Sequence, residues 1–234
     1  MAKNRRIRPL SDSVLLEGRS LWSVNANPGV AIRGESLRKF RGVEHRRWDP
    51  NRSKLAAALL RTRNNPSDLL PQAGSTVLYL GAGHGTTISH LHDHLCGSGN
   101  QKSGRLIAVD LAPRCLRDLT YLAEQRPGLV PVLGDARKFE TWGVLLPRKV
   151  NWLFQDVAQA GQVEIFTSAV RRFLSQDGIG LLSLKAASER HREANERDVF
   201  ASAIAKLSQE LELIEHINLT GFEDQHALFV VRRR

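Results

Sequence analysis

The chain has 234 residues, a length that suits one ordinary domain with a small appendage. Lysine and arginine outnumber aspartate and glutamate by 34 to 24, so the formal net charge is +10, which favours a polyanionic partner. With 41% hydrophobic residues, no apolar run long enough to span a bilayer and only two cysteines, the composition excludes a disordered, membrane-spanning or disulfide-stapled protein. We therefore expect a reducing, cytoplasmic environment.

Residues 1–50 are predicted to form a small antiparallel β domain, followed by a second domain over residues 51–234. Short strands are expected over residues 13–19, 21–26 and 30–40, with turn chemistry at Asn27-Pro28-Gly29. A helix is expected to start near Pro50, with Asp49 as its cap, and to continue through residues 53–60.

From residue 76 onward, unbroken apolar strands alternate with helices. Strands are expected at 76–80, 105–111, 129–133, 150–154 and 178–185, and helices at 86–95, 113–125, 159–174 and 192–211. This alternation indicates a parallel sheet with helices on both faces. The last two strands, 213–219 and 227–231, are joined by a loop too short for a parallel crossover. The predicted fold is therefore α/β, a doubly wound, seven-stranded, mostly parallel sheet that ends in an antiparallel strand.

A glycine-rich turn follows the first of these strands. Gly81-Ala82-Gly83-His84-Gly85 leads into a helix, and such a turn lets the backbone approach a ligand closely. Thr86 stands where the dinucleotide fingerprint needs a glycine, which disfavours a nicotinamide- or flavin-dependent oxidoreductase. Asp110 and Asp135 end the next two strands, where they could bind ribose hydroxyls and adenine. We favour a site for an adenosine-containing ligand, although the glycines alone fit an ordinary tight turn equally well.

Charged side chains also occur at the ends of apolar strands. Asp156 follows strand 150–154, Lys185 closes strand 178–185 and His226 opens the last strand, so all three are expected at one edge of the sheet. Because a lone buried lysine is costly, Asp156 is the expected partner of Lys185. Lys54 would join them if the helix near residue 50 packs over this edge. Ordinary ion pairs remain the alternative for any one of these groups, whereas four convergent groups indicate a site.

Five segments of the chain resemble the fibrillarin family, methyltransferases of C/D-box ribonucleoproteins. The matching segments are residues 48–57, 77–90, 133–136, 156–159 and 224–231. Because the sequence shows no glycine- and arginine-rich stretch before them, we expect the archaeal type of this family. The resemblance implies a Rossmann-like methyltransferase fold, S-adenosylmethionine as cofactor, and guide-dependent 2′-O-methylation of ribose in pre-rRNA, with tRNA as a further candidate.

The resemblance also implies partners. These are a C/D-box guide RNA, the target RNA, a Nop-domain scaffold protein and a kink-turn-binding ribosomal-type protein; no metal is implied. A non-catalytic RNA-binding assembly subunit of the same particle is the alternative.

The same resemblance assigns residues to roles. The implied catalytic set is Lys54, Asp156, Lys185 and His226. The expected cofactor contacts are Gly81, Ala82, Gly83, Thr86, Thr87, Asp110, Asp135, Ala136, Asp156 and Gln159. Lys185 is expected nearest the ribose oxygen, either as a base or as a positive charge that stabilises the alkoxide.

Histidines, cysteines and arginines outside this set receive simpler interpretations. His90 and His94 share a helix face, but His84 and His92 do not complete a ligand set, so surface or capping roles are expected instead of metal binding. Cys96 and Cys115 are expected to be buried. The basic cluster over residues 38–52, next to the implied catalytic lysine, is the expected contact for RNA phosphates.

Overall fold

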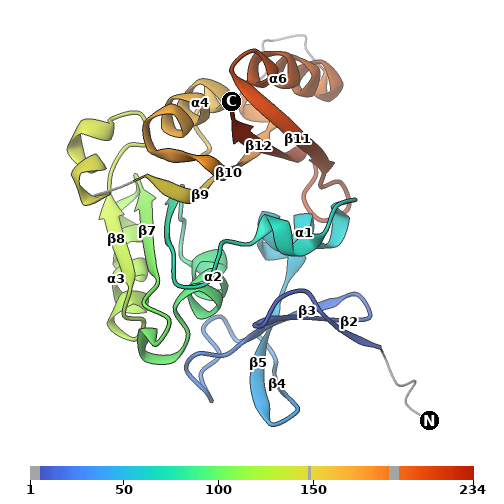
Figure 1. Ribbon diagram of the computed structural model, residues 1–234, viewed down its shortest axis with the longest axis vertical. Coiled ribbons are helices and arrows are strands. Elements are labelled where there is room, and N and C mark those ends of the chain that lie inside the picture. Colours follow the sequence, from blue (N-terminus) through green and yellow to red (C-terminus); the bar gives the residue numbers. More distant parts are fainter. Residues whose placement is uncertain (1–5, 147–148, 190–194) are drawn as a thin grey trace.

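The structure is a computed structural model that describes residues 6–146, 149–189 and 195–234. It contains a five-stranded and a seven-stranded sheet, with α1 and α2 located between the N-terminal strands and the larger sheet (Figure 1). None of the helices in the described part of the chain is long and apolar enough to cross a membrane.

The larger sheet has the strand order β11-β12-β10-β9-β6-β7-β8. Its strands are β6 (Thr76–Leu80), β7 (Arg105–Asp110), β8 (Leu129–Leu133), β9 (Val150–Gln155), β10 (Leu174–Lys185), β11 (Leu211–Asn218) and β12 (His226–Arg233). All neighbouring strands are parallel except β12, which runs antiparallel to both β10 and β11. The predicted mostly parallel sheet with an antiparallel end is therefore confirmed. The chain order reverses between β6 and β9, the position at which doubly wound sheets bind ligands.

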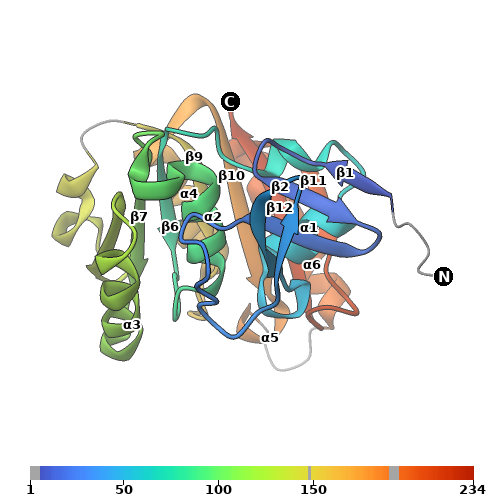
Figure 2. The ribbon, with the colours of Figure 1, turned by 90° about the horizontal axis from the view of Figure 1, so that it is seen from below.

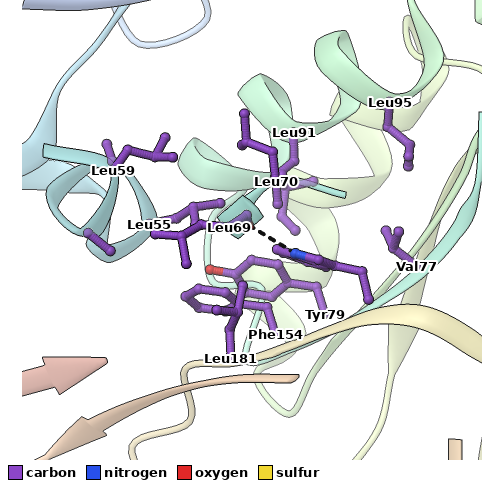
Figure 3. Packing of buried hydrophobic residues seen from close by; sticks show 14 of the residues in the cluster. Leu55, Leu59, Leu69, Leu70, Val77, Tyr79, Leu91, Leu95, Phe154 and Leu181 are labelled. Atoms are coloured by element: carbon purple, nitrogen blue, oxygen red, sulfur yellow. Dashed lines mark hydrogen bonds between the residues drawn. The ribbon is translucent and has the colours of Figure 1, made fainter. Parts of the chain in front are cut away.

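Helices cover both faces of this sheet. One face carries α1 (Lys54–Arg61), α2 (Thr86–Cys96) and α3 (Pro113–Glu124), and the other carries α4 (Gln162–Phe173), α5 (Ala186–Glu189) and α6 (Glu196–Glu210). Short 3-10 helices are η1 (Pro50–Arg52), η2 (Pro66–Leu69), η3 (Ser98–Asn100), η4 (Phe139–Thr141) and η5 (Gly143–Leu145). Figure 3 shows Leu55 of α1 packed near Tyr79 and Phe154 of the sheet, which fixes the start of α1 over the sheet edge.

Several element boundaries differ from the predicted ones. Asp49 caps η1, and α1 begins after it with Ser53 as its own cap. Helix α4 begins at Gln162 because Gly161 before it is left-handed, with φ 75°. Helix α6 begins at Glu196, where Asn195 caps it, and residues 192–194 of the expected helix lie outside the described residues. Helix α5 was not predicted, and β10 begins at Leu174 with a register shift before Ile179.

The N-terminal sheet is antiparallel, as predicted, but has five strands where three were expected. They are β1 (Ile7–Pro9), β2 (Val14–Glu17), β3 (Ser20–Val24), β4 (Leu37–Phe40) and β5 (Val43–Trp48), in the order β1-β2-β3-β5-β4. Most of the expected strand over residues 30–40 is irregular. Strand β5 was missed because Arg46 occupies a buried position on it, which hides the apolar pattern of an inward face.

The expected boundary between residues 50 and 51 stays a prediction. It falls within η1, which leads from the N-terminal sheet to α1. Buried Leu21 and Trp48 of the N-terminal sheet belong to the same hydrophobic core as Leu55 of α1. The two parts therefore share one apolar core on this side of the molecule.

A buried ion-pair network fastens the N-terminal sheet to α2. Arg46 donates to Asp93 at 2.7 and 3.0 Å and to Glu35 at 2.5 Å, and Arg126 lies 3.3 Å from the other carboxylate oxygen of Asp93. Burial alone would raise the pKa of Asp93, but the hydrogen bond from His92 and the two arginine charges lower it. The Arg46 side chain is 0% exposed. The expectation that the whole basic cluster over residues 38–52 contacts RNA is therefore wrong for Arg46, because a buried charge is held by its partners.

The histidines of α2 are buried, which corrects the expectation of surface or capping roles. Helix α2 lies between the two sheets (Figure 2), so its sides are covered. His90 Nδ1 lies 2.7 Å from the Ser23 hydroxyl, and His94 bridges the Ser13 hydroxyl at 2.5 Å and the Pro71 carbonyl at 2.7 Å. His92 is likewise buried. Both cysteines are buried, as predicted.

Candidate active site

A pocket of about 700 Å³ opens at the carboxyl edge of the larger sheet, where β6 and β9 are neighbours. We call it the glycine-turn pocket. Its lining residues are Lys54, Gly81, Gly83, Val109, Asp110, Leu111, Ala112, Gly134, Ala136, Asp156, Val157, Ala158, Gln159, Lys185, Glu223 and His226. The volume is in the range of sites for small molecules and cofactors.

The glycine turn brings the ends of β6 and β9 together. Gly81 has φ +80°, and a Cβ there would lie 2.3 Å from the carbonyl oxygen of Asp156. The backbone N–H of Asp156 donates to the carbonyl of Leu80 at 2.8 Å, which holds this close approach. Gly83 has open space where a Cβ would be. The turn thus places Asp156 beside the pocket and leaves room for a ligand next to Gly83.

Lys54 is the charged centre of the site. Its Nζ lies 3.2 Å from Asp156 Oδ2 and 4.0 Å from Glu223 Oε1. Burial alone would lower the pKa of Lys54, but the charges of Asp156 and Glu223 outweigh burial and raise it. Lys54 therefore carries its proton at neutral pH and neutralises the carboxylates of the pocket.

Lys185 and His226 lie side by side at the end of the β10–β12 ladder, where they are register partners. His226 Nδ1 lies 2.9 Å from the carbonyl of Asp224. Because a carbonyl only accepts, Nδ1 carries the hydrogen, and Nε2 is the ring nitrogen left for a ligand. These two side chains and Lys54 all line the glycine-turn pocket.

The expected ion pair between Lys185 and Asp156 is not formed, since Asp156 pairs with Lys54. In the described residues, no carboxylate oxygen lies within 4.0 Å of the Lys185 ammonium, and Lys185 is exposed. The strand register explains this, because Gln155 pairs with Leu182 and Lys185 therefore extends about 7 Å beyond the level of Asp156. Lys185 is a solvent-facing cation at the mouth of the site, not a buried one.

Glu223 is a pocket residue that sequence reasoning missed. It lies near both Lys54 and His226, with its Oε2 4.0 Å from His226 Nδ1. The acidic pair Glu223-Asp224, separated from His226 only by Gln225, was the available signal, but Glu223 was interpreted only as part of a short connecting loop.

Two predicted cofactor contacts have fixed positions at the pocket. The Asp110 carboxylate accepts from the backbone N–H groups of Gly83 at 2.7 Å and of Ala112 at 2.9 Å. Gln159 has a buried Oε1 with no hydrogen-bond partner among the residues that the structure describes. An oriented carboxylate and an unsatisfied acceptor in the same pocket fit a ligand with hydroxyl and amino donors.

Asp135 forms an ion pair instead. Its carboxylate pairs with Arg137 at 2.6 Å, and the hydrogen bonds from the Arg137 side chain and backbone lower the pKa of Asp135 to about 2.

Most of the predicted site residues line the pocket. They are Lys54, Gly81, Gly83, Asp110, Ala136, Asp156, Gln159, Lys185 and His226. The predicted residues Ala82, Thr86, Thr87 and Asp135 do not line it. Thr86 lines a second cavity, and Thr87 donates to the Ser53 hydroxyl at 3.0 Å.

Comparison with known proteins gives one family. The sequence profile of the Fibrillarin family matches residues 13–234. The chain is 40% identical to a fibrillarin-like rRNA/tRNA 2′-O-methyltransferase of Methanosarcina barkeri over 227 residues, which cover 94% of this chain and 95% of that protein.

Solved structures agree with this match. Aeropyrum pernix fibrillarin, crystallised with natively bound S-adenosyl-L-methionine, superimposes with a TM-score of 0.80 and 32% identity, covering 99% of this chain and 100% of that one. The fibrillarin of a fibrillarin/Nop5p complex gives a TM-score of 0.79 and 29% identity, covering 98% of both chains. Since the profile, the relative and the structures each cover nearly the whole chain, the chain belongs to the fibrillarin family.

Proposed function

We propose that the chain is an S-adenosylmethionine-dependent RNA 2′-O-methyltransferase. The observation that carries the proposal is the convergence of Lys54, Asp156, Lys185 and His226 on one pocket beside the glycine turn. It is supported by the Methanosarcina barkeri relative, named as an rRNA/tRNA 2′-O-methyltransferase, and by the cofactor bound to the Aeropyrum pernix protein.

The residues of the pocket fit S-adenosylmethionine. Asp110, fixed by two backbone N–H groups, is suited to accept from ribose hydroxyls, and the unsatisfied Oε1 of Gln159 is suited to an amino donor. The open side of Gly83 leaves room for a ligand against the turn. S-adenosylmethionine, when bound, supplies an electrophilic methyl group.

The chain's own charged residues then act on the ribose. Lys185, exposed at the mouth of the pocket, stabilises as a cation the negative charge that develops on the 2′-oxygen, or in its neutral amine form accepts the proton of the 2′-hydroxyl. Lys54 stays protonated between Asp156 and Glu223 and adds a second positive charge. His226 presents Nε2 beside Lys185 and orients the ribose. Alignment of the hydroxyl with the methyl donor is the main requirement of the reaction.

Selection of the target nucleotide is the finer part of the proposal. We infer that a C/D-box guide RNA selects it within a particle that contains a Nop-domain scaffold protein and a kink-turn-binding ribosomal-type protein, in the cytoplasm. The solved complex of a relative with Nop5p supports the scaffold. The net charge of +10 supports RNA binding, and the low aromatic content of 6% suits an enzyme that does not itself read bases by stacking.

Reconstitution of the particle tests the proposal. Wild-type particle should methylate the guided ribose, and Lys185→Ala should abolish methylation while calorimetry shows unchanged S-adenosylmethionine affinity. Asp110→Ala should instead weaken cofactor affinity. A wild-type chain that binds no S-adenosylmethionine would refute the activity, and a particle that assembles without turnover would favour the non-catalytic alternative. Loss of cofactor binding in Lys185→Ala would make that lysine structural.

A further inference from the structure

A second cavity, of about 280 Å³, lies between the N-terminal sheet and the start of α2. We call it the arginine cavity, because Arg33, Arg46, Arg47 and Arg52 all line it. Thr86, the first residue of α2, lines it as well. The cavity is separate from the glycine-turn pocket and has no part in the chemistry derived above.

The arginine cavity carries unneutralised positive charge. Its two acidic residues, Glu35 and Asp49, are outnumbered by the four arginines. Glu35 is bound to the buried Arg46, and the Asp49 carboxylate accepts two hydrogen bonds from Asn51. Arg47 and Arg52 are exposed, and neither has a carboxylate within 4.0 Å in the parts of the chain that the structure describes. Their guanidinium groups are available to an anion from solution.

The arginine cavity adjoins the glycine-turn pocket. Arg52 precedes Lys54 by two residues, and Thr86 follows Gly83 by three, so the same two segments border both spaces. The hydrogen bond of 3.0 Å from the Thr87 hydroxyl to Ser53 joins these segments. Because Ser53 also caps α1, Arg52 and Lys54 on either side of it are held on one rigid connection.

We propose that the arginine cavity binds a backbone phosphate of the target RNA strand, next to the nucleotide that is methylated. The proposal rests on the proposed function, because it requires a ribose at Lys54 and Lys185. Each ribose of an RNA strand is flanked by phosphates, so a cationic cavity that borders the pocket is suited to bind one of them. Guanidinium groups bind phosphate with two parallel hydrogen bonds, which gives position as well as attraction.

The test uses the reconstituted particle with Arg47→Gln, Arg52→Gln and the double variant. Arg172→Gln is the matched control, since Arg172 is an exposed arginine of α4 on the opposite face of the sheet. Each cavity variant should raise the KM for target RNA about tenfold and reduce the salt dependence by about one phosphate contact. The turnover number at saturating RNA and the S-adenosylmethionine affinity should stay unchanged, and so should the KM of the control.

A second set of substrates identifies the phosphate. Target RNAs carry one neutral methylphosphonate at each position around the methylated nucleotide in turn. In wild type, one position should raise KM about tenfold, and in the double variant that position should have no further effect, because the two changes remove the same contact. The proposal would be overturned if every methylphosphonate position raised KM equally in wild type and in the double variant. It would also be overturned if the Arg172→Gln control were as impaired as the cavity variants. A wild-type particle without activity would count against the methyltransferase function instead.

Discussion

Gly81 is the position at which one methyl group tests the geometry of the candidate site. It has φ +80°, and a Cβ there would lie 2.3 Å from the carbonyl oxygen and 2.6 Å from the carbonyl carbon of Asp156. Ordinary carbon–oxygen contacts need about 3.3 Å or more, so Gly81→Ala must move the backbone at Asp156 by about 1 Å. The Asp156 carboxylate, which holds Lys54 at 3.2 Å, would move with it.

Two separate costs follow from this substitution. The left-handed backbone costs a non-glycine residue about 1–2 kcal/mol, and the overpacked contact adds about 1–3 kcal/mol. We therefore expect the free energy of unfolding to fall by about 2–5 kcal/mol. A displacement of about 1 Å at a catalytic group lowers rates by about 100-fold, so kcat in the reconstituted particle should fall by about that factor.

Gly42→Ala is the matched control, because Gly42 has φ +84° and no heavy atom within 4 Å of the Cβ position. It introduces the same backbone strain without an overlap. Urea unfolding should show a loss of about 1–2 kcal/mol for Gly42→Ala, and single-turnover methylation should be unchanged. The reasoning fails if Gly81→Ala keeps wild-type kcat, or if the control loses activity to the same extent.

Three further perturbations test the site and the buried groups that hold α2 in place. Glu223→Gln removes one carboxylate 4.0 Å from Lys54, an interaction worth about 1 kcal/mol. Methylation should therefore slow about fivefold while the cofactor affinity is unchanged, and an unchanged rate would contradict a positioning role for Glu223. Asp93→Asn breaks a buried ion-pair network and should lower the free energy of unfolding in urea by about 3–5 kcal/mol, and a loss below about 1 kcal/mol would show that the network is dispensable.

Burial also lowers the folded-state pKa of His90 and His94. The unfolded chain therefore binds more protons below about pH 6.5. The free energy of unfolding should be highest above that pH and fall by up to about 1.4 kcal/mol per pH unit for each histidine between pH 6.5 and 5. A free energy of unfolding that does not change over this range would refute the conclusion that both histidines are buried without charge.

The sequence was informative wherever a pattern is local and repeats. Apolar strands alternating with helices predicted the larger sheet, and the short loop before His226 predicted its antiparallel end. The charged residues Asp156, Lys185 and His226 at strand ends were correctly expected at one edge, because strand direction alone decides which ends share an edge.

Which charged side chains pair with each other in the site could not be predicted, because it depends on distances between strands and helices that the sequence does not contain. The partner of Asp156 was misassigned because the offset between β9 and β10 is set by packing along both strands, and it extends Lys185 beyond Asp156. Glu223 reaches the site only because α1 packs against the loop before β12, which is a tertiary contact. Arg46 looked like a surface charge because its partner Asp93 lies 47 residues away on another element.

The misjudged Arg46 and the buried histidines have a common physical basis in the position of α2. The helix begins at the glycine turn, and the N-terminal sheet holds it through Arg46, Ser13 and Ser23. The same sheet leads through η1 directly into Lys54. One rigid connection therefore sets the glycine turn, the arginine cavity and Lys54 relative to one another. Under the proposed function, the N-terminal sheet, which by sequence had no chemistry of its own, would for this reason help to position RNA and cofactor.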